Sequence, residues 1–172
     1  HAAAGVRAVA ALGQRAFGEN YLQEALDKQA ALADLPLEWH FIGPVQSNKT
    51  RRLAESFDWV HTVDRLKIAQ RLSEQRPAQR PPLSVCIEVN VDGEPTKSGV
   101  AEAELPALAH AVAALPNLRL RGLMAIPAPA ADFAAQRRPH ARLRAAFDAL
   151  RADGLALDTL SIGMSDDLEA AV

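Results

Sequence analysis

Ser84-Val85-Cys86-Ile87-Glu88-Val89 and Leu118-Arg119-Leu120-Arg121-Gly122-Leu123-Met124-Ala125-Ile126 are the two stretches that decide the fold of this chain. Both are nearly continuous in apolar character, which is typical of parallel strands that are covered on both faces. Four further strand-like runs lie at residues 16–19, 38–42, 59–62 and 159–162. A helical pattern follows each of the six runs, so the sequence predicts an α/β protein with a parallel sheet.

Two architectures fit this alternation, a (β/α)8 TIM barrel and an open doubly wound sheet. No G-x-G-x-x-G turn follows any of the strands, so the dinucleotide-binding version of the open sheet lacks its phosphate turn. We therefore predict the barrel, which needs eight strands where six are found. The chain starts at His1 inside an alanine-rich helical pattern and stops at Val172 inside another. We expect residues 1–172 to be a single barrel domain that is incomplete at both ends, without its first and last strands.

Composition narrows the class of protein. With 172 residues, 49% of them hydrophobic, the chain can bury one sizeable core. A formal net charge of −2, with basic and acidic residues interspersed, argues against a nucleic-acid partner. No stretch reaches the roughly 18 apolar residues of a membrane span. The single cysteine, Cys86, cannot form an internal disulfide, which fits a reducing compartment. We expect a cytoplasmic protein that binds neither nucleic acid nor membrane.

Polar side chains gather just after the predicted strands, where ligands bind in parallel α/β folds. They are small, amide and hydroxyl residues, and they include Asn20, the segment Gln46-Ser47-Asn48-Lys49 and Asn90. Histidine, cysteine and carboxylate residues do not occur at metal-ligand spacing, and no nucleophile turn is present. The sequence thus predicts a binding site without a metal and without catalytic residues.

Ser161-Ile162-Gly163-Met164-Ser165 joins the last strand to a helix that is predicted to begin near Asp166. Free backbone N–H groups, the positive end of that helix and two hydroxyls would attract a phosphate, and Gly163 would let the backbone approach it closely. Alternatively, Ser165 only caps the helix while Asp166 and Asp167 complement its dipole. Spacing alone leaves both interpretations open.

His40 lies within Trp39-His40-Phe41-Ile42. By strand alternation its side chain points into the barrel if Trp39 and Phe41 face the helices. It is either part of a ligand site or a hydrogen-bonded core histidine. Met124, after Arg121-Gly122-Leu123, is typical of core packing, although a thioether also packs well beside an aromatic ring.

Five motifs together resemble the pyridoxal phosphate homeostasis protein family, the YggS/PROSC type. They occur in the family's order and cover nearly the whole chain: Phe17-Gly18-Glu19-Asn20-Tyr21, Trp39 through Lys49, Lys97-Ser98-Gly99, Arg121 through Ile126, and Ser161 through Asp167. The resemblance implies a barrel like the N-terminal domain of alanine racemase that binds pyridoxal 5′-phosphate near the carboxyl ends of its strands, without established turnover.

The resemblance also implies where the cofactor binds. In the family a lysine at the end of the first strand forms a Schiff base with the cofactor, and that lysine is expected N-terminal to His1. A turn with glycine and threonine after the last strand is expected beyond Val172. The matching positions in this chain are Asn20, His40, Met124, Ser161, Gly163, Met164 and Ser165. Ser161 and the backbone of residues 163–165 are expected nearest the phosphate.

Three functions follow as alternatives. The first is a non-catalytic carrier or buffer of pyridoxal phosphate, expected as a monomer, that supplies cofactor-dependent client enzymes. The second is a pyridoxal-dependent amino-acid racemase, which would need a second base such as the sole tyrosine, Tyr21. The third is a barrel that binds another phosphorylated metabolite through the same turn. The first is the prediction, because no acid–base pair for amino-acid chemistry is evident.

Overall fold

The computed structural model describes residues 2–94 and 97–172. Six strands form one sheet in which every neighbouring pair is parallel. They are β1 (Ala16–Glu19), β2 (Glu38–Phe41), β3 (Trp59–Val63), β4 (Leu83–Glu88), β5 (Leu118–Met124) and β6 (Thr159–Ser161). All six predicted strands are confirmed, each within two residues of its expected ends.

Helices connect and cover these strands. They are α1 (Ala3–Ala11), α2 (Leu22–Ala31), the short 3-10 helix η1 (Ser47–Lys49) with α3 (Thr50–Ser56), α4 (Leu66–Gln75), α5 (Leu105–Ala113), α6 (Phe133–Ala152) and α7 (Leu168–Ala171). Within residues 2–94 and 97–172, none of these helices has the length and apolar character that a membrane crossing requires.

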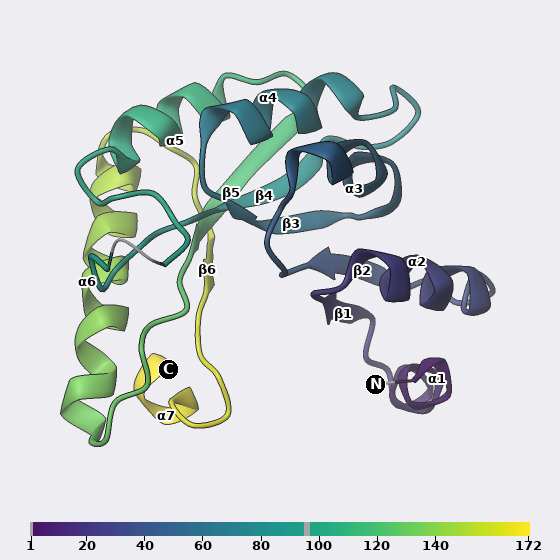
Figure 1. Cartoon of the computed structure of the whole chain (residues 1–172), viewed down its shortest axis with the longest axis horizontal. Coiled ribbons are helices and arrows are strands. Elements are labelled where there is room, and N and C mark those ends of the chain that lie inside the picture. Colours follow the sequence, from purple (N-terminus) through teal and green to yellow (C-terminus); the bar gives the residue numbers. More distant parts are fainter. Residues whose placement is uncertain (1, 95–96) are drawn as a thin grey trace.

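The order of the strands distinguishes the two candidate architectures. It runs β1-β2-β3-β4-β5-β6, without the reversal that defines a doubly wound sheet. Sequential right-handed crossovers place every helix on the same side, so the sheet curls with the helices outside. Figure 1 shows this arc, with β1 and β6 at its two open edges. The fold is a six-stranded parallel half-barrel.

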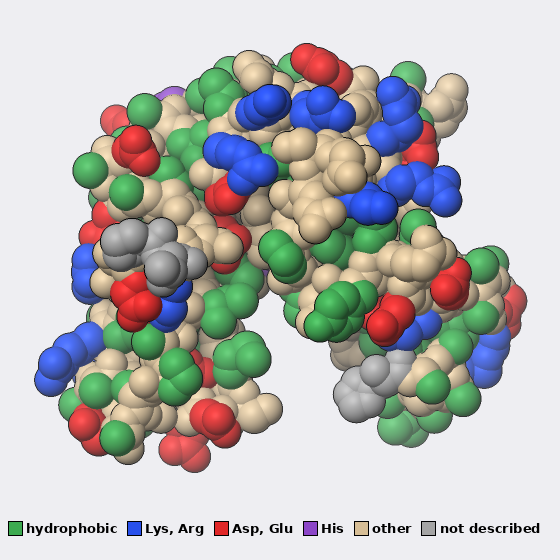
Figure 2. Space-filling model, in the orientation of Figure 1, with side chains coloured by type: hydrophobic (Ala, Val, Ile, Leu, Met, Phe, Trp, Pro, Cys, Tyr) green, Lys and Arg blue, Asp and Glu red, His purple; other side chains and the backbone are tan. Residues whose placement is uncertain are grey.

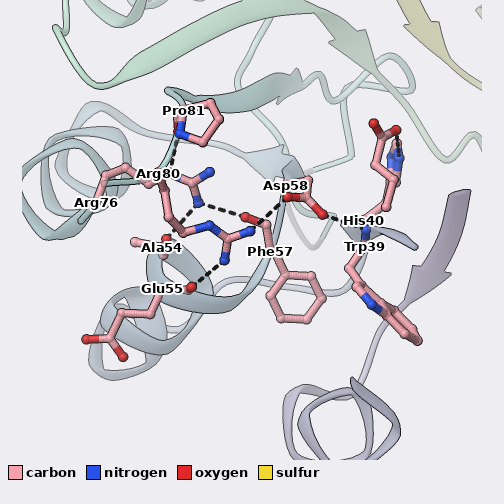
Figure 3. Close-up of polar contacts among 10 residues, drawn as sticks. Trp39, His40, Ala54, Glu55, Phe57, Asp58, Arg76, Arg80 and Pro81 are labelled. Atoms are coloured by element: carbon pink, nitrogen blue, oxygen red, sulfur yellow. Dashed lines mark hydrogen bonds and ion pairs between the residues drawn. The ribbon is translucent and has the colours of Figure 1, made fainter. Parts of the chain in front are cut away.

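The outer face of the sheet carries the main hydrophobic core. Trp39 and Phe41 of β2 are buried there, and Phe41 makes an edge-to-face contact with Phe57 at 5.4 Å between ring centroids. His40 leaves the strand on the opposite side, as Figure 3 shows. The predicted alternation in β2 is therefore confirmed. A second, smaller cluster of Trp59, Cys86 and Met124 lies on the inner face.

Two arginines bond to the segment that joins α3 to β3. The Arg76 side chain donates from Nη1 to the carbonyls of Ala54 and Phe57, each at 2.7 Å, and burial lowers its pKa to about 10. Arg80 pairs with Asp58 at 2.8 Å, and Asp58 in turn accepts the backbone N–H of Trp39 at 2.9 Å (Figure 3). These contacts tie the ends of α3 and α4 to the edges of β2 and β3.

Gly122 sets the separation of β5 and β6. A Cβ atom at this position would lie 1.7 Å from the carbonyl oxygen of Thr159. Only glycine therefore allows β6 to pair with β5 in the observed register, in which Met124 lies opposite Ser161.

The last turn differs from the prediction. The helix after β6 begins at Leu168, two residues after the predicted start near Asp166. Asp167 occupies the N-cap position, so Ser165 does not cap this helix.

Candidate functional site

A chain of hydrogen bonds crosses the inner face from β2 to β6. His40 Nε2 lies 2.8 Å from Glu38 Oε1, and His40 Nδ1 lies 2.9 Å from Nε2 of His61 on β3. His61 Nδ1 lies 2.7 Å from the hydroxyl of Ser161. Residues 100 positions apart in the sequence are thus in direct contact. The curvature of the half-barrel brings them together.

Aromatic rings hold this chain in place. The His40 imidazole stacks on Trp59, with centroids 5.2 Å apart and an interplanar angle of 10°. Trp59 also contacts His61 at 5.6 Å. The Arg121 guanidinium carbon also lies 4.6 Å from the centroid of the Trp59 ring. Arg121 is held there by Asp158, which accepts a hydrogen bond from Nε at 2.8 Å. Stacking of this kind restricts imidazole rotation, so the hydrogen-bonding atoms keep their positions.

Burial sets the charge of the inner-face groups. It lowers the pKa of His61 to about 4, with a smaller contribution from His40, so His61 is neutral near pH 7. It raises the pKa of the Cys86 thiol to about 12, which makes the thiol unreactive. It also raises the pKa of Glu88 to about 7, helped by the Asp64 carboxylate. Hydrogen-bonding and neutral groups therefore dominate this face.

The turn after β6 has the features of an anion site. Gly163 has a φ of +91°, a conformation that side-chain-bearing residues rarely adopt. Among the described residues, the backbone N–H groups of Gly163, Ser165 and Asp166 have no hydrogen-bond acceptor. Ser161, which precedes them, has its hydroxyl on the inner face. Three available amides and a hydroxyl within six residues can bind phosphate oxygens.

Asp167 modifies this turn. Its carboxylate accepts the N–H of Met164 and lies 2.9 Å from Nε2 of the buried His140 on α6. The Met164 amide holds the pKa of Asp167 below its ordinary value. One of the amides expected for the phosphate is therefore already bonded, and Asp167 is directed toward Met164 and His140.

Asn20 lies in a different environment. It follows β1 and lines a cleft of about 490 Å³ together with Tyr21, Gln46 and Lys49. No hydrogen bond joins Asn20 to the inner-face chain within the described residues. The Tyr21 side chain is 64% exposed at the start of α2, and it makes no contact with the histidines among those residues.

A larger cavity, of about 740 Å³, opens at the amino ends of the strands, away from the Ser161 turn. Its lining includes Arg15, Asp58, Arg76 and Arg121. Arg76 and Arg121 are held by the carbonyls and carboxylates described above. The lining also includes Glu38 and Trp59, so the Glu38 end of the hydrogen-bond chain borders this cavity. Figure 2 shows the outline of the molecule, which is deeply notched between the α6–α7 side and the α1–α2 side. No group of histidine, cysteine and carboxylate residues suited to a metal ion occurs within residues 2–94 and 97–172.

The structure thus brings some of the predicted residues together. His40 and Ser161 belong to one hydrogen-bond chain, Met124 is the register partner of Ser161, and the turn 163–165 follows directly. Sequence reasoning missed His61, which bridges the two. The alternation argument used for His40 would have found it, because His61 is two residues after Trp59 and opposite in direction to the buried Val60.

Comparison with known proteins identifies the family of the chain. The model of the alanine racemase N-terminal domain family matches residues 1–171. The chain is 70% identical over 170 residues to the pyridoxal phosphate homeostasis protein of Pseudomonas aeruginosa, covering 99% of this chain and 73% of that protein. It is 56% identical over 163 residues to the protein of the same name from Escherichia coli K12, covering 93% and 70%.

Solved structures show the same fold. PipY of Synechococcus elongatus with pyridoxal phosphate bound is 38% identical, with a TM-score of 0.91 over 99% of this chain and 81% of that one. An alanine racemase of Clostridium difficile, 13% identical, has a TM-score of 0.69 over 88% of this chain and 39% of that one, which shows the fold alone. The chain belongs to the alanine racemase N-terminal domain family and, within it, to the pyridoxal phosphate homeostasis proteins.

Proposed function

We propose that this chain binds pyridoxal 5′-phosphate through the turn after β6 and serves as a non-catalytic carrier or buffer of the cofactor. The observation that carries this proposal is the combination of the Ser161 hydroxyl with the acceptor-free amides of Gly163, Ser165 and Asp166 among the described residues. The names of the relatives, and the cofactor in the PipY structure, support it.

The residues of this chain fit the phosphate group. A Cβ atom at Gly163 would lie 3.0 Å from the Cβ of Ala171, so glycine keeps the backbone of the turn open. Amide and hydroxyl donors match an anion that only accepts hydrogen bonds. When bound, pyridoxal phosphate supplies an aldehyde and a conjugated ring. His40, His61 and Met124 would line the inner face beside the turn, and Asn20 would lie farther away, at the end of β1.

The wider expectations belong to this proposal. We expect residues 1–172 to form part of one domain, closed by two further strands into a (β/α)8 barrel. That protein would act in the cytoplasm as a monomer and deliver the cofactor to client enzymes. The racemase alternative has less support, because the Tyr21 side chain is 64% exposed and no hydrogen bond joins it to the inner-face chain within the described residues.

Equilibrium dialysis with pyridoxal phosphate and with pyridoxal, using the complete protein, tests the proposal. Ser161→Ala should weaken pyridoxal phosphate binding about 10- to 100-fold, since it removes one hydrogen bond to an ionised group. Pyridoxal, which has no phosphate, should bind weakly and be unaffected by the substitution. Ser84→Ala is the matched control, because Ser84 lies at the amino end of β4 and the Ser161 turn follows the carboxyl end of β6.

Equal binding of pyridoxal phosphate by wild type and Ser161→Ala would contradict the site. Racemisation of alanine and several other amino acids, followed by chiral chromatography, tests the alternative function. Turnover at the rate of ordinary enzymes would replace the carrier proposal with the racemase.

A further inference from the structure

The hydrogen-bond chain Glu38–His40–His61–Ser161 has a fixed number of hydrogens to share when both histidines are neutral. Its three contacts join four groups, and each contact needs one hydrogen. An ionised Glu38 has none to give. His40, His61 and Ser161 supply one each, so all three hydrogens are used.

Only one arrangement of these hydrogens satisfies every contact. Glu38 can only accept, so His40 donates from Nε2 and accepts at Nδ1. His61 must then donate from Nε2 to His40 and accept at Nδ1. Ser161 therefore donates its hydroxyl hydrogen to His61, and only lone pairs remain on its oxygen for any ligand.

This arrangement is unsuited to a phosphate dianion. A dianion offers only acceptor oxygens, and the second pKa of a phosphate monoester is about 6. Turning the Ser161 hydroxyl toward the ligand would leave two acceptors, Ser161 Oγ and His61 Nδ1, 2.7 Å apart. Leaving a buried polar pair unbonded in this way costs about 1 to 3 kcal/mol.

One additional proton resolves the conflict. If His40 is protonated, it donates from Nε2 to the Glu38 carboxylate and from Nδ1 to His61. His61 then takes its other neutral tautomer and donates from Nδ1 to Ser161, whose hydrogen becomes free for the ligand. The charge rests on His40, beside a carboxylate at 2.8 Å, and the buried His61 stays neutral.

We propose that binding of a phosphate dianion at Ser161 is coupled to the uptake of one proton by His40, transmitted through a tautomer change of His61. This inference rests on the proposed phosphate site and adds that His40 is a positioning residue, acting on Ser161 through His61. Affinity for the dianion at Ser161 therefore falls as the pH rises, because one proton is taken up together with the ligand.

Other ionisable groups face this chain from each neighbouring strand. Glu38 lies on β2, His61 on β3, Cys86 and Glu88 on β4, and Arg121 on β5. Arg121 is paired with Asp158, and Cys86 is neutral over the whole physiological range. Glu88 titrates near pH 7, but the perturbing charge that it feels is Asp64 and not a histidine. The variant Glu88→Gln therefore serves as a check that the measured proton belongs to His40.

The test is calorimetric titration of the complete protein with pyridoxine 5′-phosphate, which lacks the aldehyde. Measurements at pH 8 in buffers of different ionisation enthalpy give the number of protons taken up. We expect about one proton per ligand for wild type and for Glu88→Gln. Because one proton is bound with each ligand, the affinity at this pH should fall about tenfold per pH unit.

The variant His40→Asn distinguishes proton uptake from ligand binding. The Asn amide nitrogen takes the position of His40 Nδ1 and is a permanent donor to His61, so proton uptake should drop by about one while binding at pH 8 persists. His110→Asn, a substitution of an exposed histidine on α5, is the matched control and should behave as wild type. Equal proton uptake by wild type and His40→Asn would overturn the coupling.

Two further measurements keep the test decisive. Glu38→Gln, at a half-exposed side chain, supplies an amide N–H that can donate to His40 Nε2, so a neutral His40 can donate from Nδ1 to His61 without an added proton. Proton uptake at pH 8 should therefore drop by about one in this variant, and uptake equal to that of wild type would contradict the proposal. Phosphorus NMR should show the bound phosphate as a dianion, and a bound monoanion would place the proton on the ligand instead. If wild type does not bind pyridoxine phosphate at all, the proposed function fails together with this inference.

Discussion

At the scale of single residues, the site depends on the placement of two residues, Ser161 and Gly163. Ser161 must lie on the inner face to reach His61, and Gly163 must take a positive φ directly afterwards. The sequence shows that a serine and a glycine are present but not that they act together. The protonation state of the histidines decides whether the serine can donate to a ligand.

Gly163→Ala should weaken binding of pyridoxal phosphate. The substitution forces a side chain into a φ of +91° and brings its Cβ to 3.0 Å from Ala171. Gly154→Ala is the matched control, since Gly154 has a φ of +95° with nothing within 4 Å and precedes β6, whereas the turn follows β6. Each should cost about 1 to 2 kcal/mol in the free energy of unfolding.

Only Gly163→Ala should change the dissociation constant measured by dialysis. Equal loss of affinity in both variants would mean that the turn is not the binding site.

At the scale of elements, β2 and β3 carry the histidines, and their shared edge is held by arginines. Arg76 bonds three backbone carbonyls, those of Ala54, Phe57 and Pro81. Two of these carbonyls lie at the end of α3 and one precedes β4. The Arg76 side chain, which follows α4, therefore connects the ends of α3 and α4 to the start of β4. Sequence periodicity predicts each segment but does not identify this clamp, because the partners are backbone atoms.

Arg76→Met should destabilise the protein by about 3 kcal/mol. The substitution keeps much of the apolar volume but leaves buried carbonyls without donors. Urea unfolding followed by circular dichroism gives the free energy. Arg144→Met is the control, because Arg144 forms only an exposed pair with Asp148 one helical turn away. It should cost no more than about 0.5 kcal/mol. Similar losses in both variants would refute the clamp.

At the scale of the whole molecule, the stability of the fold should depend on pH through Glu88. Its folded pKa of about 7 lies above its ordinary value of 4.5, so the native state binds the proton more tightly than the unfolded chain. The stability that protonated Glu88 contributes is fully present below pH 4.5 and is lost as the pH rises through 7.

Glu88→Gln removes this dependence. The stability of the variant relative to wild type should increase between pH 5 and pH 8, as measured by urea midpoints at both values. Glu74→Gln, at an exposed position on α4, should show no such trend. A constant difference between Glu88→Gln and wild type across this range would show that Glu88 is not protonated in the folded protein near neutral pH.

The sequence by itself determined the six strands, the helices between them and the side of the sheet to which His40 points. These features follow from periodicities of two and 3.6 residues, which are local. The family could also be identified from the sequence, because each of the five motifs is a continuous run of residues. The start of the last helix was predicted two residues too early, since Asp166 and Asp167 carry the composition of a helix start while the helix begins at Leu168.

Only the tertiary structure decided which residues meet. His61 and Ser161 are 100 positions apart, and their contact depends on how far the sheet curls and on the close approach of β5 and β6 at Gly122. Curvature accumulates from the twist between every pair of strands, so no single segment encodes it. The proton count of the Glu38 to Ser161 chain, and the proposal built on it, exist only once that curvature has brought the four side chains together.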